Sequence, residues 1–531
     1  MLVPLFVLMM TGKTLLRLVS AALFASPIAA GAQDSVDILI RGGSLIDGTG
    51  SAARRADVGI RGDRIVFVGD AASRRFRAGR EIDARGLTVS PGFIDPHSHT
   101  FGDLGHADPR RRQNAGSLMQ GVTTVVTGND GGGPIDVGAE LKRLEGLTMG
   151  TNVALFTGFG TIRSKVLGPS SGAPDAKQLA QMREYVKTGM EGGALGLSTG
   201  LYYAPQSYAK TEEVIALARE AASRGGIYDS HLRDESSYTI GLLGAISEAI
   251  RIGREAGLPV HIAHIKALGV DVWGQSDSAI ALIRAARASG QRVTADQYPY
   301  TASGTSVGAS LLPRWAEAGG RDSLRQRAAD PATRERLLVE MRENLRRRNG
   351  AKSLLLTGGS SEVRGKTLEE IAKAQGTEPV EAALTIILNG GASVASFNMD
   401  EKDIRAFMQQ DFVLTGSDGS GGHPRKFGAF SKKLREYVLE KKVIPLETMI
   451  RQSTSATAAA LGIPDRGLVK EGAWADVIVF NPSEVRDRST FEEPELLAEG
   501  MRWVLVNGTV AIENGKLTDR LAGRGIRRAP R

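Results

Sequence analysis

Four of the seven histidines stand at the ends of short apolar segments that we interpret as β-strands. His97 and His99 end FIDPHSH, His231 ends GIYDSH and His264 ends PVHIAH. Because alternate residues of a strand share a face, His97 and His99 can point to one spot. Imidazole nitrogens are common zinc ligands, so these side chains become candidate metal ligands if the strand ends meet.

Two aspartates follow strand-like segments in the same way. Asp130 stands in TGNDGGG after VTTVVTG, and Asp418 comes directly after FVLTGS. Carboxylates and imidazoles together suit zinc, and one bridging carboxylate can join two ions. We therefore expect one or two zinc or other divalent ions, held by the four histidines with Asp130 and Asp418. Asp418 is also our candidate for the general base of a hydrolytic reaction.

The other three histidines do not fit this ligand set. His261 precedes His264 by three positions, so strand alternation predicts that its side chain points to the opposite face. We leave His106, His261 and His423 outside the expected metal site.

The composition of the 531-residue chain excludes several classes of protein. It has no cysteine, which rules out disulfides, thiolate zinc sites, iron–sulfur clusters and cysteine nucleophiles. Lys and Arg number 67 against 59 Asp and Glu, and the surplus is spread along the chain apart from a small basic group at the C-terminus. A nucleic-acid surface needs a clustered basic stripe, so we expect no nucleic-acid partner.

The elements that would position these residues lie between 91 and 458. Short apolar strands alternate there with helical stretches in units of about 30 to 40 residues. Eight such units predict an α/β fold, a (β/α)8 TIM barrel with its active site at the carboxyl ends of the strands. An insertion at about 301–410 is expected to form a lid or one wall of the site. A doubly wound sheet is the weaker alternative, because no G-x-G-x-x-G opens a helix after the first strand.

Both ends of the chain have a different pattern from the middle. Residues 33–90 and 459–531 alternate apolar and polar residues between Gly and Asp turns, as antiparallel hairpins do, and the second segment ends in a basic tail. We expect one small β-sandwich domain built from both segments. Two separate β modules are the alternative, although each would be short of core by itself.

Residues 1–32 have the pattern of a signal peptide. Lys13 and Arg17 precede an apolar run, and Ala30-Gly31-Ala32 supplies a small-residue cleavage site. Translation from Met10 would give the charged region its usual place, and an apolar helix packed on the domain is the alternative. We expect an exported, periplasmic protein with no stable membrane insertion after cleavage, because no later segment has about 18 unbroken apolar residues.

A series of motifs carries a family resemblance. PGFIDPHSHT, GVTTVVTGN, ALGLSTGLYYAP, SHLRDE, HIAHIK, TADQYPYTASGT and GSDG…HPRKFGAF occur in this order. The chain resembles the D-aminoacylases (N-acyl-D-amino-acid deacylases) of the metal-dependent amidohydrolase superfamily, over about 37–510. The resemblance implies the barrel and the small β domain, and the metal-dependent hydrolysis of N-acyl-D-amino acids to a carboxylate and a D-amino acid. The D configuration rests on this resemblance alone.

Four further residues are expected to bind the substrate. Lys266 lies two positions after His264, and Arg425 follows the eighth strand with a planar fork that suits a carboxylate. In the family that the chain resembles, these two residues hold the α-carboxylate of the substrate together with tyrosines at the positions of Tyr203 and Tyr298.

The chain departs from the family pattern at three positions. Asp130 stands in GNDG where the family has a metal-binding cysteine in GNCG. Gly304 occupies the place of a serine expected to contact the substrate, and Phe159 in GFGT replaces the histidine of GHGT. A carboxylate still binds zinc, so metal binding is retained in our interpretation.

Other functions remain open on the sequence. The same centre would serve a dipeptidase or a cyclic amidase, and a nucleobase deaminase would need the same metal. A non-catalytic relative that only binds is a further alternative, although it would be expected to have lost ligands. The oligomeric state stays open.

Overall fold

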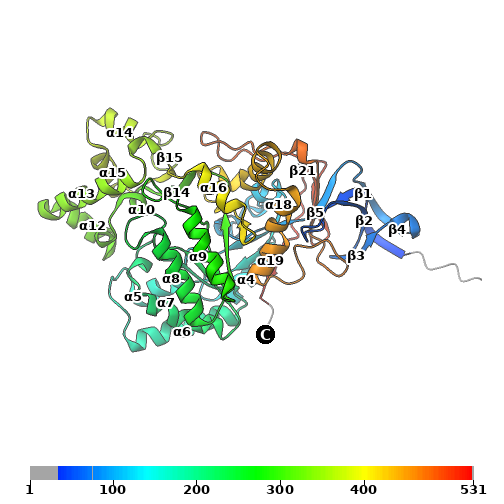
Figure 1. Ribbon diagram of the computed structural model, residues 1–531, viewed down its shortest axis with the longest axis horizontal. Coiled ribbons are helices and arrows are strands. Elements are labelled where there is room, and N and C mark those ends of the chain that lie inside the picture. Colours follow the sequence, from blue (N-terminus) through cyan, green and yellow to red (C-terminus); the bar gives the residue numbers. More distant parts are fainter. Residues whose placement is uncertain (1–33, 75, 529–531) are drawn as a thin grey trace, which may run out of the picture.

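The computed structural model describes residues 34–74 and 76–528. The predicted signal peptide, residues 1–32, lies outside the described residues. No helix within the described part of the chain combines the length and the apolarity needed to cross a bilayer. Figure 1 shows a barrel in the middle, a β-rich domain at one end and a mostly helical unit at the other.

Eight parallel strand positions form the barrel. Neighbouring strands pair in parallel register from β6 to β8 and from β9 to β17, and a parallel bridge between Ser98 and Gly419 joins the first strand end to the last. The third position is shared by two short strands. The strands are β6 (Phe93–Asp95), β7 (Val122–Thr127), β8 (Asn152–Leu155) with β9 (Thr157–Gly158), β10 (Gly196–Gly200), β11 (Ile227–His231), β12 (Val260–Ile262), β13 (Val293–Gln297) and β17 (Val413–Thr415).

Amphipathic helices surround these strands and supply the outer layer of the core. In α8 the buried residues recur at helical spacing, including Leu242, Ala245, Ile246 and Ala249. Helices that follow one another pack side by side around the barrel. They are α4 (Val137–Leu147), α6 (Ala176–Glu191), α7 (Thr211–Ala222), α8 (Gly241–Ala256), α9 (Ser276–Ala288), α16 (Glu401–Met408) and α18 (Leu446–Ser453). The predicted TIM barrel is confirmed.

Both ends of the chain contribute to one β domain. Its sheet has the order β21-β20-β19-β18-β5-β1-β2-β3, with β4 also paired to β1. The early strands are β1 (Asp34–Leu45), β2 (Arg54–Arg61), β3 (Arg64–Gly69), β4 (Phe76–Asp83) and β5 (Thr88–Pro91), and the late strands are β18 (Val477–Phe480), β19 (Met501–Val506), β20 (Thr509–Glu513) and β21 (Lys516–Leu517). Because β18 pairs with β5, the two segments share one sheet, and the alternative of two separate modules is wrong.

The chain between β13 and α16 forms a unit with its own apolar core. It contains a three-stranded antiparallel sheet and several helices. The strands, in their order in the sheet, are β14 (Ala302–Ser306), β16 (Ser393–Phe397) and β15 (Leu354–Leu356). Those helices are α10 (Val307–Leu311), α11 (Arg314–Glu317), α12 (Gly320–Ala329), α13 (Pro331–Arg347), α14 (Leu368–Gln375) and α15 (Pro379–Leu388). We call residues 302–397 the inserted unit.

The end of the chain returns to the barrel. A short strand, β22 (Gly525–Ile526), pairs in parallel with β8, and the side chain of Ile526 is buried. Two basic residues of this segment form ion pairs, Arg524 with Asp63 at 2.7 Å and Arg527 with Glu145 at 3.0 Å.

Candidate metal centre

The six predicted ligands lie at one rim of the barrel, where the chain leaves the carboxyl ends of the strands. They are His97 and His99 after β6, Asp130 after β7, His231 at the end of β11, His264 after β12 and Asp418 after β17. Three of them have left-handed backbones, with φ of 56° at Asp130, 35° at His264 and 46° at Asp418. This conformation is uncommon outside glycine and is found at functional sites, where surrounding structure compensates its cost.

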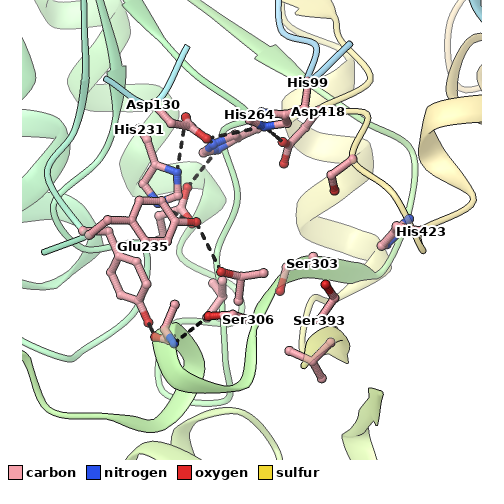
Figure 2. Close-up of a pocket in the computed structure, with 18 of the residues that line it drawn as sticks. His99, Asp130, His231, Glu235, His264, Ser303, Ser306, Ser393, Asp418 and His423 are labelled. Carbon is pink, nitrogen blue, oxygen red and sulfur yellow. Dashed lines mark hydrogen bonds and ion pairs between the residues drawn. The ribbon is translucent and has the colours of Figure 1, made fainter. Parts of the chain in front are cut away.

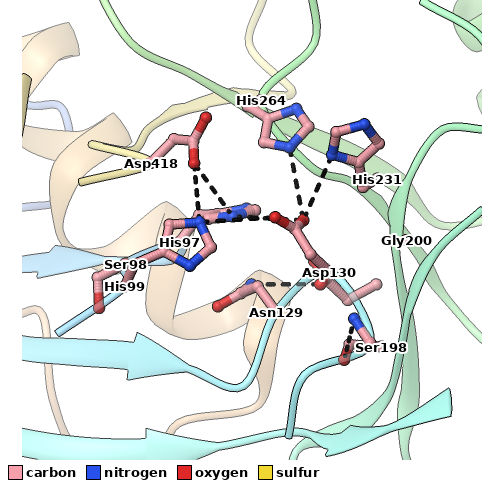
Figure 3. A network of polar contacts seen from close by, with 12 residues as sticks. His97, Ser98, His99, Asn129, Asp130, Ser198, Gly200, His231, His264 and Asp418 are labelled. Carbon is pink, nitrogen blue, oxygen red and sulfur yellow. Dashed lines mark hydrogen bonds and ion pairs between the residues drawn. The ribbon is translucent and has the colours of Figure 1, made fainter. Parts of the chain in front are cut away.

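The carboxylate of Asp130 lies among the imidazoles (Figure 3). Its Oδ1 is 3.5 Å from His97 Nε2, 3.6 Å from His231 Nδ1 and 3.5 Å from His264 Nε2, while its Oδ2 is 3.5 Å from His99 Nε2. These distances are long for hydrogen bonds. They match the separation of about 3.4 Å between two ligands that each lie about 2.1 Å from a tetrahedral zinc ion. Asp130 is therefore placed to bridge two histidine pairs.

Several buried atoms of this centre have no hydrogen-bond partner. They are both ring nitrogens of His97, both ring nitrogens of His231, and Oδ1 of Asp130. Unpaired polar atoms in a buried site are costly unless a metal or water satisfies them. Imidazole nitrogens and carboxylate oxygens are ligands that zinc accepts, so the residues present fit a zinc ion.

Asp418 contacts the centre on the side of His97 and His99. Its Oδ1 is 3.0 Å from His99 Nε2 and 3.6 Å from His97 Nε2, and its Oδ2 is 2.6 Å from Arg425 Nη1. Burial raises the pKa of the Asp418 carboxyl, but Arg425 and the histidines lower it by more, so the net shift is downward. The pKa of Asp130 is also lowered overall, because the histidines outweigh its burial. Both groups are thus in the charged form that a metal binds.

A further carboxylate, Glu235, contacts the ring nitrogens of His231 and His264 that do not face Asp130. Its Oε1 is 3.1 Å from His264 Nδ1, and its Oε2 is 3.8 Å from His231 Nε2. Lys266 Nζ donates to the same Oε1 at 2.5 Å and to the backbone oxygen of His264 at 2.8 Å. A carboxylate that holds the second ring nitrogen of a ligating histidine fixes its orientation. Together with His231 and His264, Glu235 also forms a second group of atoms close enough to hold an ion.

A cavity of about 710 Å³ opens over the centre. Figure 2 shows the histidines and acidic residues on one side of it and serines of the inserted unit facing them. The four predicted substrate-binding residues, Lys266, Arg425, Tyr203 and Tyr298, all line this cavity. Tyr203 Oη is 3.4 Å from Thr305 Oγ1 of the inserted unit, and Tyr298 Oη has no partner. The inserted unit therefore forms one wall of the site.

The sequence pattern of the amidohydrolase family matches residues 80–512. The chain belongs to this family. A D-aminoacylase of Alcaligenes xylosoxydans xylosoxydans is 34% identical over 93% of this chain and 98% of its own length. An N-acyl-D-glutamate deacylase of the same organism is 34% identical over 93% and 97%.

A solved structure of another relative has a similar overall fold. The N-acyl-D-glutamate deacylase of Bordetella bronchiseptica, complexed with zinc and a phosphonate inhibitor that mimics the tetrahedral intermediate, is 31% identical. It superposes with a TM-score of 0.79 over 93% of this chain and 100% of that chain. The resemblance to the D-aminoacylases is confirmed, and the chain is a hydrolase of the amidohydrolase family.

The positions that depart from the D-aminoacylase pattern have different surroundings in this amidohydrolase. Asp130 lies between the four histidines of the metal centre. Gly304 lines the cavity, and a Cβ there would lie only 3.1 Å from Arg425 Nη2, so the missing side chain allows that guanidinium to lie close to the backbone. Phe159 is fully buried in the main apolar core and does not line the cavity.

The histidines outside the predicted set make other contacts. His423 lines the cavity, but its Nε2 lies 3.0 Å from the backbone oxygen of Ala302. His261 is buried and hydrogen-bonds Asp296 at 2.9 Å and Thr294 at 2.9 Å. The prediction that His261 and His264 point to opposite faces does not apply, because β12 ends at Ile262 and His264 has a left-handed backbone.

Sequence reasoning missed Glu235. Its signal was available in SHLRDE, where a glutamate follows His231 by four residues. The chain bends after His231. The spacing alone therefore does not predict that the side chains of His231 and Glu235 both lie next to His264.

Proposed function

We propose that this amidohydrolase hydrolyses the amide bond of N-acyl-D-amino acids and releases a carboxylate and a D-amino acid. The observation that carries the proposal is the position of Asp130 among four histidines at the barrel rim, inside a cavity that also holds Lys266 and Arg425. The relatives that act on N-acyl-D-amino acids support the substrate class and its configuration.

The residues would hold zinc in two sets that share Asp130. His231 and His264 would bind one ion, and His97, His99 and Asp418 would surround the other. When bound, zinc lowers the pKa of a water ligand from 15.7 to about 7 and polarises a carbonyl oxygen.

The chain's own groups supply proton transfer and substrate orientation. Asp418 takes the proton of the attacking water and returns one to the leaving nitrogen, because an amide does not expel an unprotonated amine anion readily. Arg425 has its Nε without a partner, so it can hold the α-carboxylate while Nη1 keeps its contact with Asp418. Lys266, Tyr203 and Tyr298 line the same cavity and contribute ammonium and hydroxyl hydrogen-bond donors.

A substrate panel with metal analysis tests the proposal. We expect hydrolysis of N-acetyl-D-leucine and N-acetyl-D-methionine, with the L-isomers and dipeptides at least 100-fold slower in kcat/KM, about 3 kcal/mol of discrimination. Purified protein should contain zinc or another divalent ion by mass spectrometry. Turnover of only L-substrates or dipeptides, or full activity of metal-free protein, would contradict the proposal.

A matched pair of variants tests the role of Asp418. Asp418→Asn keeps the shape but removes the base, and we expect turnover to fall by about 10²–10⁴-fold while metal stays bound. Asp411→Asn is the control, since Asp411 lies on the surface and pairs with Arg287. Retained activity in Asp418→Asn would remove this residue as the base.

We further propose that residues 1–32 direct export to the periplasm. The charged residues, apolar run and small-residue site of this segment support the proposal. Fractionation of cells that express the full chain should place the protein, shortened by about 32 residues, in the periplasmic fraction. Uncleaved protein in the cytoplasm would contradict it.

A further inference from the structure

Three arginines of the described chain stand out as large side chains that are almost completely buried: Arg163, Arg348 and Arg425. Arg163 pairs with Glu213 at 3.1 Å, and Arg425 pairs with Asp418 at 2.6 Å. Arg348 forms no ion pair with any carboxylate in residues 34–74 and 76–528. A buried charge without a partner is strongly unfavourable, so an anion that completes Arg348 is expected.

The contacts of Arg348 leave part of its guanidinium free. Its Nε donates to the backbone oxygen of Ser310 at 3.1 Å, and its Nη2 donates to Tyr202 Oη at 3.1 Å. Its Nη1 is buried and has no hydrogen-bond partner. The hydroxyl of Tyr238 is likewise buried and unpartnered, and its ring lies 5.8 Å from Arg348 Cζ.

Both unsatisfied groups belong to the cavity over the metal centre. Arg348 and Tyr238 line it together with Glu317. Glu317 does not neutralise Arg348, because its carboxylate pairs with Arg314 at 2.5 Å. This part of the cavity therefore carries one positive charge in excess.

Arg348 and the metal centre lie on the same cavity, with Tyr202 between them. The ring of Tyr202 lies 5.8 Å from the ring of His231, and the hydroxyl at the other end of Tyr202 accepts from Arg348. One tyrosine side chain thus separates Arg348 from a predicted metal ligand. The residues expected to hold the α-carboxylate, Lys266 and Arg425, contact Glu235 and Asp418. Arg348 contacts Ser310 and Tyr202, so it is a separate positive group of the same cavity.

We propose that Arg348 and Tyr238 form a second carboxylate subsite, and that the preferred substrates carry an acidic group besides the α-carboxylate. The inference rests on the proposed deacylase function. The second carboxylate has two possible sources, an acidic amino-acid side chain or an acidic acyl chain. Either would accept hydrogen bonds from Nη1 and from the Tyr238 hydroxyl and would balance the buried guanidinium.

Two pairs of substrates of equal shape test the subsite and identify the source. N-acetyl-D-glutamate is compared with N-acetyl-D-glutamine, and N-succinyl-D-alanine with its terminal amide. In the wild-type, zinc-loaded enzyme we expect the acid of one pair to exceed its amide by about 10- to 100-fold in kcat/KM, as for a hydrogen bond to a charged group. The pair that shows this preference reveals the source. A ratio near one in both pairs would overturn the subsite.

Variants then connect the preference to Arg348. In Arg348→Gln the acid-to-amide ratio should fall to near one. Arg346→Gln removes the same charge from the exposed surface of α13, where Arg346 pairs with Asp271, and should keep the wild-type ratio. A purely structural role for Arg348 would lower both members of a pair equally, and an unchanged ratio in Arg348→Gln would contradict the proposal.

The outcomes separate this inference from the proposed function. Hydrolysis of N-acetyl-D-leucine without any acid preference would leave the deacylase function standing and remove only the subsite. If no N-acyl-D-amino acid is hydrolysed, isothermal titration with N-acetyl-D-glutamate and N-acetyl-D-glutamine decides the matter. Tighter binding of the acid that disappears in Arg348→Gln would support the subsite, and equal binding would overturn it.

Discussion

At the scale of single residues, the surroundings of Glu235 combine charge balance with ligand orientation. The carboxylate contacts His264 Nδ1 and Lys266 Nζ at the same time. Burial raises the pKa of Glu235, but Lys266 and the two histidines lower it by more, so the group stays ionised. It therefore neutralises a buried lysine and directs His264 Nε2 toward Asp130.

Replacing Glu235 by glutamine should weaken metal binding. Glu235→Gln keeps the size of the side chain but loses the charge that holds His264, and we expect zinc affinity to fall by about 10- to 100-fold. Competition with a chromophoric chelator measures this. Glu369→Gln, on an exposed helix where Glu369 pairs with Lys373 at 3.2 Å, is the control. Equal affinity in wild type and Glu235→Gln would show that the carboxylate does not orient a ligand.

At the scale of elements, the last strand ties the end of the chain to the barrel. Residues Gly525 and Ile526 of β22 pair with Val153 and Ala154 of β8, and Ile526 is buried with its apolar neighbours. The sequence indicated only that the chain ends in a basic tail. In the structure, Arg524 forms an ion pair with Asp63, and Arg527 forms one with Glu145.

Removing this strand should destabilise the protein. Deletion of residues 523–531 exposes the edge of β8 and removes the buried Ile526 side chain, and we expect a loss of about 2–4 kcal/mol in the free energy of unfolding. Urea denaturation measures this. Deletion of residues 529–531 leaves every contact named above in place and serves as the control. Identical unfolding midpoints for both deletions would contradict a structural role for β22.

At the scale of the whole molecule, a buried polar cluster joins the β domain to the barrel. Asp476, which precedes β18, forms an ion pair with Arg466 and accepts from Asn152 of β8 at 3.1 Å. It also accepts from the backbone of Asn507 at 2.8 Å, and the Asn507 side chain donates to Asn152 at 2.7 Å. One carboxylate thus links the C-terminal part of the β domain to the third barrel strand.

Loss of this charge should weaken the whole fold. Asp476→Asn leaves Arg466 buried without a carboxylate, with its hydrogen bond to Asn507 remaining, and breaking a buried ion pair in this way costs about 3–5 kcal/mol. The control is Asp465→Asn, because Asp465 is exposed and lies 3.8 Å from Arg64. Thermal and urea unfolding of both variants should show the loss only in Asp476→Asn. A stable Asp476→Asn protein would mean that this ion pair does not contribute to the stability of the fold.

The sequence by itself determined the barrel and the ligand types at its rim. Each strand is recognised from a short local segment, and the carboxyl ends of parallel barrel strands lie at one face. These two points together predict that His97, His99, His231 and His264 lie close to one another. The β domain was also predictable, since its hairpin pattern is local even though its two halves are far apart in sequence.

Only the tertiary structure decided which side chains meet across turns and between units. Glu235 reaches His264 because the chain turns after β11, and Arg348 of the inserted unit meets Tyr202, which precedes it by 146 residues. Strand periodicity ends where left-handed residues such as His264 begin, so it could not orient His261 relative to His264. Charge balance in a buried cavity depends on all the groups packed around it, and no local pattern in the chain contains that sum.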